Sequence, residues 1–150
     1  MYRRVHPVDI SDALGVIDQV GFFAVNRGGP PEKFPCCVAT PPFHQPIQSM
    51  IDRLRLGGEI RRTLLRRLDA RQSAPLHVDR WMPVGLDWRR FHIPLISDEF
   101  VIMQWPDAGK SVWLEPGYLW EVRFDTPHEV VNLSDNPRIH LQIDVVDATI

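Results

Sequence analysis

The stretch Leu-His-Val-Asp-Arg-Trp places His77 and Asp79 one residue apart in a segment that reads as a β-strand. Alternate side chains of a strand point to the same face, so this imidazole and this carboxylate would lie side by side. His128 follows far along the chain, directly after Pro127. Two histidines and one carboxylate on one face of an octahedral ion leave coordination positions open, as in non-haem Fe(II) oxygenases. A His-x-Asp pair alone is also common as a structural pair, and it is His128 that favours a metal site.

Arg138 stands ten positions after His128, on the next expected strand. A guanidinium offers a planar fork of donors that matches a carboxylate, and burying it is costly unless an anion binds it. Taken alone, Arg138 is most simply explained by a surface pair with Asp135 or Asp144. Beside the metal ligands it would instead hold an anionic ligand.

The length and composition favour one soluble, β-rich domain over residues 1–150. The chain has a formal net charge of -2, 14 prolines and five tryptophans. Near-balanced charge gives no bias toward nucleic acid or an anionic membrane, and many prolines favour strands punctuated by turns. No apolar run approaches the roughly 20 residues that span a bilayer.

The N-terminus and the cysteines favour a cytoplasmic protein. The segment Met-Tyr-Arg-Arg-Val-His-Pro-Val-Asp-Ile lacks the apolar core of a signal peptide. The two cysteines, Cys36 and Cys37, are adjacent, and a disulfide between neighbours is strained. We therefore expect two reduced, half-buried thiols.

Residues 1–72 are expected to form a region of helices and loops that packs on the sheet. Residues 9–20 have apolar side chains at helical spacing, and residues 21–28 suggest a short strand before a Gly-Gly-Pro-Pro break. A long helical pattern covers residues 46–71, interrupted at Gly57-Gly58. Its arginine-rich part, residues 59–71, is more typical of a solvated helix face than of a nucleic-acid patch, since no aromatic residues interleave.

Residues 73–147 change to a period of two, which predicts a sandwich or barrel of short strands. Turn sequences rich in glycine, proline and aspartate separate these segments. The expected strands are 74–80, 88–96, 99–105, 110–115, 118–124, 128–133 and 137–146.

The two faces of these strands differ in chemistry. In residues 88–96, Trp88, Arg90, His92 and Pro94 share one face, opposite Phe91, Ile93 and Leu95. In residues 138–145, the face with Arg138, His140, Gln142 and Asp144 opposes four aliphatic side chains. A surface sheet would turn the polar face to water. A barrel covered outside by the N-terminal helices would turn it to a polar cavity that holds a ligand or metal.

Several motifs in residues 74–146 resemble the aspartyl/asparaginyl β-hydroxylase family of Fe(II)- and 2-oxoglutarate-dependent dioxygenases. They are His-Val-Asp, then Arg-Arg-Phe-His-Ile-Pro-Leu, then the Gly-x-x-Trp turn, His128 followed by valine and asparagine, and the arginine ten positions further on. The resemblance implies a double-stranded β-helix, a jelly-roll or cupin-like barrel with flanking N-terminal helices.

The resemblance also implies roles for individual residues. His77, Asp79 and His128 would bind Fe(II), and Arg138 would hold the distal carboxylate of the co-substrate 2-oxoglutarate. His92 and Arg90 would line the inner wall where family members contact co-substrate or substrate. The reaction implied is hydroxylation of an unactivated C–H bond by O2, with succinate and CO2 as co-products.

The substrate implied is an amino acid, either free, within a peptide or within a small natural product. Candidates for the substrate mouth are Arg80, Trp81, Trp88 and Gln104, each of which packing or surface exposure would explain as well. His140 lies beside Arg138 on the same face and is expected to make a structural hydrogen bond. Two other functions stay open: a cupin-like module that binds metal or a small ligand without turnover, and an interaction protein that uses the arginine-rich segment.

Overall fold

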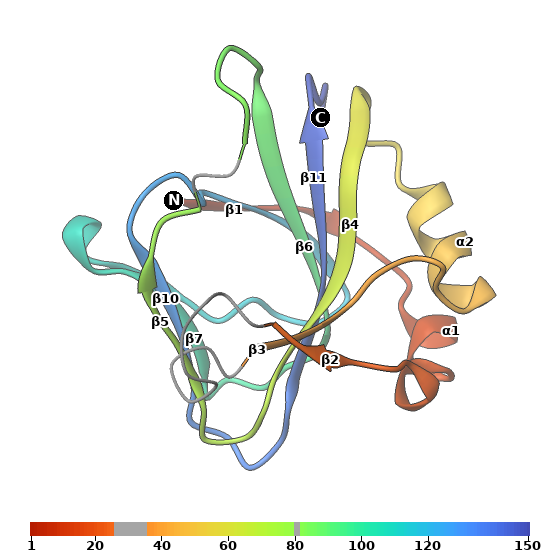
Figure 1. Cartoon of the computed structure of the whole chain (residues 1–150), viewed down its shortest axis with the longest axis horizontal. Coiled ribbons are helices and arrows are strands. Elements are labelled where there is room, and N and C mark those ends of the chain that lie inside the picture. Colours follow the sequence, from red (N-terminus) through yellow and green to blue (C-terminus); the bar gives the residue numbers. More distant parts are fainter. Residues whose placement is uncertain (26–35, 80–81) are drawn as a thin grey trace.

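The computed structural model describes residues 1–25, 36–79 and 82–150, and these form two antiparallel sheets with two α-helices. The larger sheet has the order β1-β9-β6-β11-β4-β3-β2, and the smaller has the order β5-β10-β7-β8. Figure 1 shows the helices on one side of the large sheet and the small sheet on the other. The mainly β fold with flanking helices, expected from the sequence, is confirmed.

The strands of the large sheet come from both ends of the chain. Their bounds are β1 Tyr2–Pro7, β2 Phe23–Ala24, β3 Cys36–Ala39, β4 Glu59–Leu68, β6 Trp88–Ile96, β9 Tyr118–Val122 and β11 Arg138–Val146. The small sheet contains β5 Ser73–His77, β7 Val101–Trp105, β8 Lys110–Val112 and β10 His128–Asn132. The helices are α1 Ser11–Leu14 and α2 Gln45–Arg53, with short 3-10 turns at Ile17–Gln19 and Pro106–Ala108.

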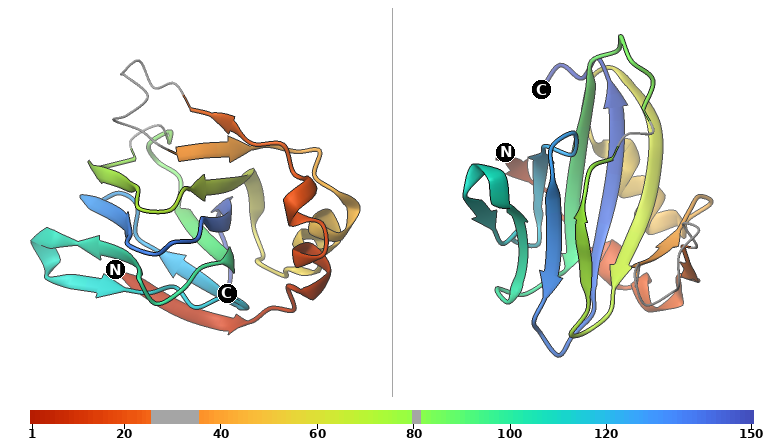
Figure 2. Two further views of the ribbon diagram at one scale, coloured as in Figure 1. Left: turned by 90° about the horizontal axis from the view of Figure 1, so that it is seen from below. Right: turned by 60° about the vertical axis from the view of Figure 1, so that its left-hand side comes forward.

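The expected strands after residue 73 are all present, with ends that differ by a few residues. The two views of Figure 2 show the small sheet facing the large one across the interior. None of the helices within the described ranges has the length and apolar character needed to cross a membrane.

The arginine-rich segment 59–71 is not a helix, which corrects the prediction from the sequence. Helix α2 ends at Arg53, and residues 59–68 form β4, which pairs with β11 and β3. Residues 1–72 therefore contribute strands to the large sheet as well as helices. Gly58 allows this change because its φ is +68° and a Cβ there would overlap the carbonyl group of Val146.

The apolar core outside the barrel explains why β4 is a strand. Leu65 on β4 packs with Ile93 on β6 and Leu141 on β11, under Ile47 and Met50 of α2. The pairing of β4 with β11 extends over nine residue pairs, from Arg138 opposite Leu68 to Val146 opposite Glu59. These long-range contacts outweigh a weak local preference for helix.

A second apolar cluster lies in the barrel interior, between the two sheets. Its buried members are Leu68, Val101, Met103, Trp105, Leu114, Trp120, Val122 and Val130. It lies beside the polar side chains that the same strands turn inward, so the barrel holds apolar and polar zones at once.

Two alanine substitutions in β4 test whether residues 59–68 form a strand or a helix. We expect Leu65→Ala, at a fully buried position, to lower the free energy of unfolding by about 2–5 kcal/mol. Ile60→Ala should change it by no more than about 0.5 kcal/mol, because Ile60 is 40% exposed in the strand. A helix that buries both side chains in one stripe would make the two losses similar. Urea unfolding followed by tryptophan fluorescence measures the difference.

Candidate metal centre and its cavity

Strands β5 and β10 bring the three predicted metal ligands together. His77 is the last residue of β5 and lies opposite His128, the first residue of β10, with ring centroids 4.4 Å apart. Asp79 follows β5, and its backbone N–H donates to the carbonyl oxygen of Phe124 at 3.2 Å. One ligand atom from each of His77, Asp79 and His128 lies within 4.8 Å of the others. Since metal–ligand bonds are about 2.1 Å, small side-chain movements would let one ion bind all three.

Backbone carbonyls set the orientation of both imidazoles. Nδ1 of His77 lies 2.6 Å from the Pro75 oxygen, and Nδ1 of His128 lies 2.8 Å from the Thr126 oxygen. A carbonyl oxygen only accepts hydrogen bonds, so Nδ1 carries the hydrogen and Nε2 offers its lone pair. Burial lowers the pKa of His128, which keeps that ring in the neutral form that binds metals.

A buried chain of charges holds the carboxylate of Asp79. One oxygen, Oδ1, lies 3.9 Å from Nε2 of His77, while Oδ2 accepts from Nη1 of Arg90. Arg90 also donates through Nε and Nη2 to both oxygens of Asp144, at 2.6 and 3.2 Å. Burial alone would raise the pKa of Asp79, but the charge and hydrogen bond of Arg90 outweigh it and lower the pKa. The carboxylate is therefore ionised, with one oxygen directed toward the histidines.

Arg138 is buried and has no carboxylate partner among the described residues. Its Nη2 donates to Nδ1 of His140 at 2.8 Å, and its buried Nε has no hydrogen-bond partner. Asp135 pairs with Arg71 and Asp144 with Arg62 and Arg90, so neither carboxylate pairs with Arg138 as the simpler interpretation required. Burial lowers the pKa of Arg138 to about 10, which leaves it charged at neutral pH.

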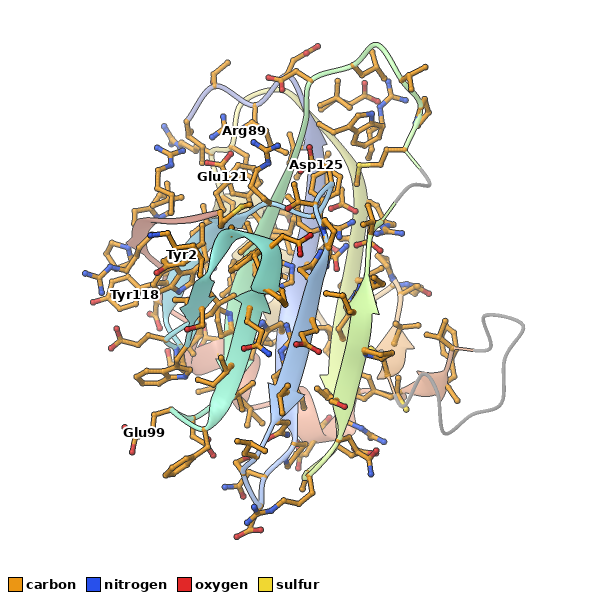
Figure 3. All side chains as sticks on the ribbon, turned by 90° about the vertical axis from the view of Figure 1, so that its left-hand side faces the viewer. Tyr2, Arg89, Glu99, Tyr118, Glu121 and Asp125 are labelled. Atoms are coloured by element: carbon orange, nitrogen blue, oxygen red, sulfur yellow. The ribbon has the colours of Figure 1, made fainter. Side chains whose placement is uncertain are left out.

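Two spaces, an inner cavity and an outer groove, adjoin the predicted metal ligands. The inner cavity, of about 40 Å³, is lined by the three predicted ligands together with Arg138 and His92. A wider groove of about 850 Å³ runs along the ends of β6 and β9 and the loop between β5 and β6. Figure 3 labels Arg89, Glu121 and Asp125, three of the residues that line this groove; Arg89 donates to Glu121 at 2.7 and 2.9 Å. Asp79, Arg90 and Phe124 line both spaces and form the wall between them.

The residues predicted to contact the co-substrate or substrate lie in different parts of the structure. Arg90 and His92 are buried on the inner wall, and Nδ1 of His92 lies 3.3 Å from Nδ1 of His140. Trp88 lines the groove and donates through Nε1 to the Pro83 carbonyl. Gln104 is not at the mouth, which corrects that prediction: it lies on the outer face of β7, where it donates to Glu129 at 2.5 Å. Arg80 and Trp81 lie outside the described residues.

Three wall residues were not identified from the sequence. Arg66 and Cys36 line the inner cavity, and the ring of Phe124 lies 4.5 Å from the guanidinium carbon of Arg90. A period-two interpretation of residues 59–68 would have turned Arg66 inward. Phe124 fell within the expected strand 118–124, but β9 ends at Val122, so strand alternation does not fix the orientation of Phe124.

Comparisons with known proteins identify the fold. No family model matches the sequence, and no curated protein does either. The viral collagen prolyl hydroxylase of Paramecium bursaria Chlorella virus 1, solved with 2-oxoglutarate, is 11% identical with a TM-score of 0.64, over 97% of this chain and 95% of its own. A Trichoplax adhaerens prolyl hydroxylase, solved with a peptide fragment of hypoxia-inducible factor, is 14% identical with a TM-score of 0.64, over 97% and 83%.

A third solved structure shares the same architecture. A predicted oxalate decarboxylase from Thermotoga maritima is 14% identical with a TM-score of 0.52, over 86% of this chain and 95% of its own. The chain thus has a jelly-roll fold, which it shares with these two prolyl hydroxylases and with the predicted oxalate decarboxylase. The expected double-stranded β-helix is confirmed.

The charge chain predicts a specific loss of stability. Arg90→Gln leaves the buried carboxylate of Asp144 with a weaker partner, and we expect the free energy of unfolding to fall by about 3–5 kcal/mol. Arg123→Gln is the matched control, since this arginine pairs with Asp125 where both side chains are more than half exposed and solvent screens the pair. Adding Asp144→Asn to Arg90→Gln should restore part of the loss. Equal losses for the two single variants would contradict a buried role for Arg90.

The buried histidines predict a pH dependence. Burial lowers the pKa of His92 and of His140 well below the ordinary value, so the unfolded chain takes up their protons first as the pH falls. Stability should therefore decrease below pH 6.5, by up to about 1.4 kcal/mol for each histidine between pH 7.5 and 5.5. Denaturant unfolding at both pH values measures this, and His92→Gln/His140→Gln should remove most of the difference. An undiminished difference in that variant would assign the effect to other groups.

Proposed function

We propose that this protein is an Fe(II)- and 2-oxoglutarate-dependent dioxygenase of the aspartyl/asparaginyl β-hydroxylase kind. The observation that carries the proposal is the pairing of two features in one cavity. His77, Asp79 and His128 converge there, and Arg138 is buried there without a carboxylate partner among the described residues. The fold shared with 2-oxoglutarate–Fe(II) oxygenases is consistent with it.

The donor set fits ferrous iron. Two neutral imidazole nitrogens and one ionised carboxylate oxygen on one side of an ion are the ligands of non-haem Fe(II) oxygenases. Hydrogen bonds from Nδ1 to backbone carbonyls orient both rings, and Arg90 holds the second oxygen of Asp79. Asp79 would therefore bind the ion through one oxygen.

Arg138 fits the distal carboxylate of 2-oxoglutarate. Its unpartnered Nε and its positive charge would find in that carboxylate the acceptor that the described residues do not supply. Arg138 and the metal ligands line the same inner cavity, so the two ends of one dicarboxylate would contact both. The cavity of about 40 Å³ holds only a few water molecules, so the lining side chains must move when the co-substrate binds. Because His140 accepts from Nη2, the guanidinium is already oriented before the co-substrate binds.

Iron with 2-oxoglutarate and O2 would supply the oxidant that hydroxylates an unactivated C–H bond, with succinate and CO2 as co-products. The residues of the chain have three roles. Backbone carbonyls and Arg90 orient the metal ligands, Arg138 binds the co-substrate, and the strands of the small sheet shield the centre from solvent on their side. Phe124 and Arg90 lie between the inner cavity and the groove. The substrate would therefore approach the metal centre from the groove.

The substrate we propose is an amino acid, either free, in a peptide or in a small natural product. The groove is wide enough to take such a molecule, and apolar loop residues such as Val84 and Leu86 line it beside charged pairs. The Trichoplax prolyl hydroxylase of similar fold, solved with a peptide fragment, gives precedent for a peptide. A cytoplasmic setting suits an iron enzyme with two unbridged cysteines.

The first test is anaerobic spectroscopy followed by turnover. Fe(II) and 2-oxoglutarate together should give a weak visible charge-transfer band, which His77→Ala should abolish by removing a ligand. Succinate release with amino acids and peptides should then identify the substrate class. Absence of the band at saturating co-substrate would reject the proposal. Metal and 2-oxoglutarate binding without succinate, across the whole panel, would favour the cupin-like binding module instead.

The second test concerns Arg138. Arg138→Ala should weaken 2-oxoglutarate binding by about 2–5 kcal/mol, because it removes the buried partner of a carboxylate. Arg71→Ala is the control, since this exposed arginine pairs with Asp135 away from the cavity. Calorimetry with Mn(II)-loaded protein measures both constants without turnover. An unchanged constant for Arg138→Ala would remove this residue from the co-substrate site.

A further inference from the structure

The arginines of β4 are divided between the two faces of the sheet. Arg66 lines the inner cavity, whereas the guanidinium of its neighbour Arg67 lies 5.2 Å from the ring of Phe22, on the helix side. Alternation along the strand requires this division. The arginine-rich segment is thus two different surfaces, and only one of them faces the metal ligands.

Arg66 is only partly engaged by protein groups. Its Nε donates to Oε1 of Gln142 at 2.7 Å, and Nη1 lies 3.9 Å from Sγ of Cys36. Within the described part of the chain, Nη2 has no hydrogen-bond partner and no carboxylate pairs with this side chain. A guanidinium has five N–H donors, so Arg66 keeps donors for a ligand.

Arg66 and Arg138 are cations close to one another in the same wall. On paired strands, Arg66 lies opposite His140, which accepts the hydrogen bond of Arg138. Burial is the main cause of the lowered pKa of Arg138, and the positive charge of Arg66 acts in the same direction. Arg138 is buried and Arg66 is half-buried, so solvent screens their repulsion only in part, and an anion between them would relieve it.

We propose that Arg66 is a second binding residue for the distal carboxylate of the dicarboxylate co-substrate, acting together with Arg138. This inference rests on the proposed function. It assigns the inner cavity a selectivity for a 2-oxo acid with a second carboxylate at its far end. A 2-oxo acid with an alkyl end would leave both guanidinium groups without an anion and would cover the buried Arg138 with an apolar group, which weakens binding.

The position of Arg66 favours the co-substrate over the hydroxylated substrate. Arg66 lines the inner cavity and does not line the groove, whereas Asp79, Arg90 and Phe124 line both. A molecule that enters from the groove meets this wall before it reaches Arg66. The carboxylate that contacts Arg66 is therefore the one that already lies inside.

The test compares two neighbouring arginines and two 2-oxo acids. Dissociation constants of 2-oxoglutarate and 2-oxovalerate are measured by calorimetry on Mn(II)-loaded protein, for the unmodified chain, Arg66→Gln and Arg67→Gln. The loss of one charged hydrogen-bonding partner should weaken 2-oxoglutarate binding about tenfold to a hundredfold in Arg66→Gln. Binding of 2-oxovalerate should change little, so the selectivity ratio falls. Arg67→Gln should leave both constants unchanged.

Each failure has a distinct meaning. If the unmodified protein does not bind 2-oxoglutarate, the proposed function fails. If Arg138→Ala weakens binding but Arg66→Gln does not, the function stands and the role of Arg66 is rejected. If Arg66→Gln raises only the KM for the hydroxylated substrate, Arg66 belongs to the substrate site and the inference is again overturned.

A second measurement uses the unmodified protein and so does not depend on a variant that folds. Cys36 lines the same cavity beside Arg66, whereas Cys37 lies 3.9 Å from the outward-facing Arg67. Bound 2-oxoglutarate should slow alkylation of Cys36 by iodoacetamide, with Cys37 as the internal control, as read by peptide mass spectrometry. Equal rates at Cys36 with and without saturating 2-oxoglutarate would place the co-substrate away from Arg66.

Discussion

Every residue of β11 is buried, and this constraint organises the rest of the molecule. The strand pairs with β4 on one side and β6 on the other, so its side chains alternate between the helix-covered core and the barrel interior. The outward half is aliphatic and packs under α2. The inward half is polar, from Arg138 to Asp144. Buried polar groups must find hydrogen-bond partners or a ligand, so a polar interior on this scale has to be accounted for group by group.

The two ends of the barrel interior differ in how their charges are paired. Toward the groove, Arg90 binds both Asp79 and Asp144, and Arg62 binds Asp144 at 2.9 Å, so charges alternate and compensate. At the start of β11, the polar contacts of Arg138 and Arg66 among the described residues are with histidine, glutamine and thiol groups only. The first arrangement fixes the position of a metal-binding carboxylate. The second leaves positive charge for an anion, and the predicted metal ligands lie in the wall of the same cavity.

Much of this could be predicted from the sequence because period two is a strong signal once strands are identified. It gave the strands after residue 73 and the face that carries His92, Arg138 and His140. Residues 59–68 were predicted as a helix instead, because arginine and leucine suit a helix locally and only the long pairing with β11 selects a strand. The ion pairs of Arg90 could not be predicted from the sequence either. Asp144 is distant along the chain, and a shared strand face does not show which side chains are in contact.

Asp79, Arg90 and Phe124 separate the inner cavity, which contains the metal ligands, from the groove that would take the substrate. The inner cavity is built mostly from paired strands, and Asp79, just past the end of β5, is held by Arg90 and by the hydrogen bond from its N–H to the Phe124 carbonyl. The groove is built partly from the loop between β5 and β6, where Val84 is 98% exposed and has little packing to constrain it. Loops tolerate change that strands do not. Substitutions in this loop can therefore alter what the groove accepts while the metal ligands and the buried arginines keep their geometry.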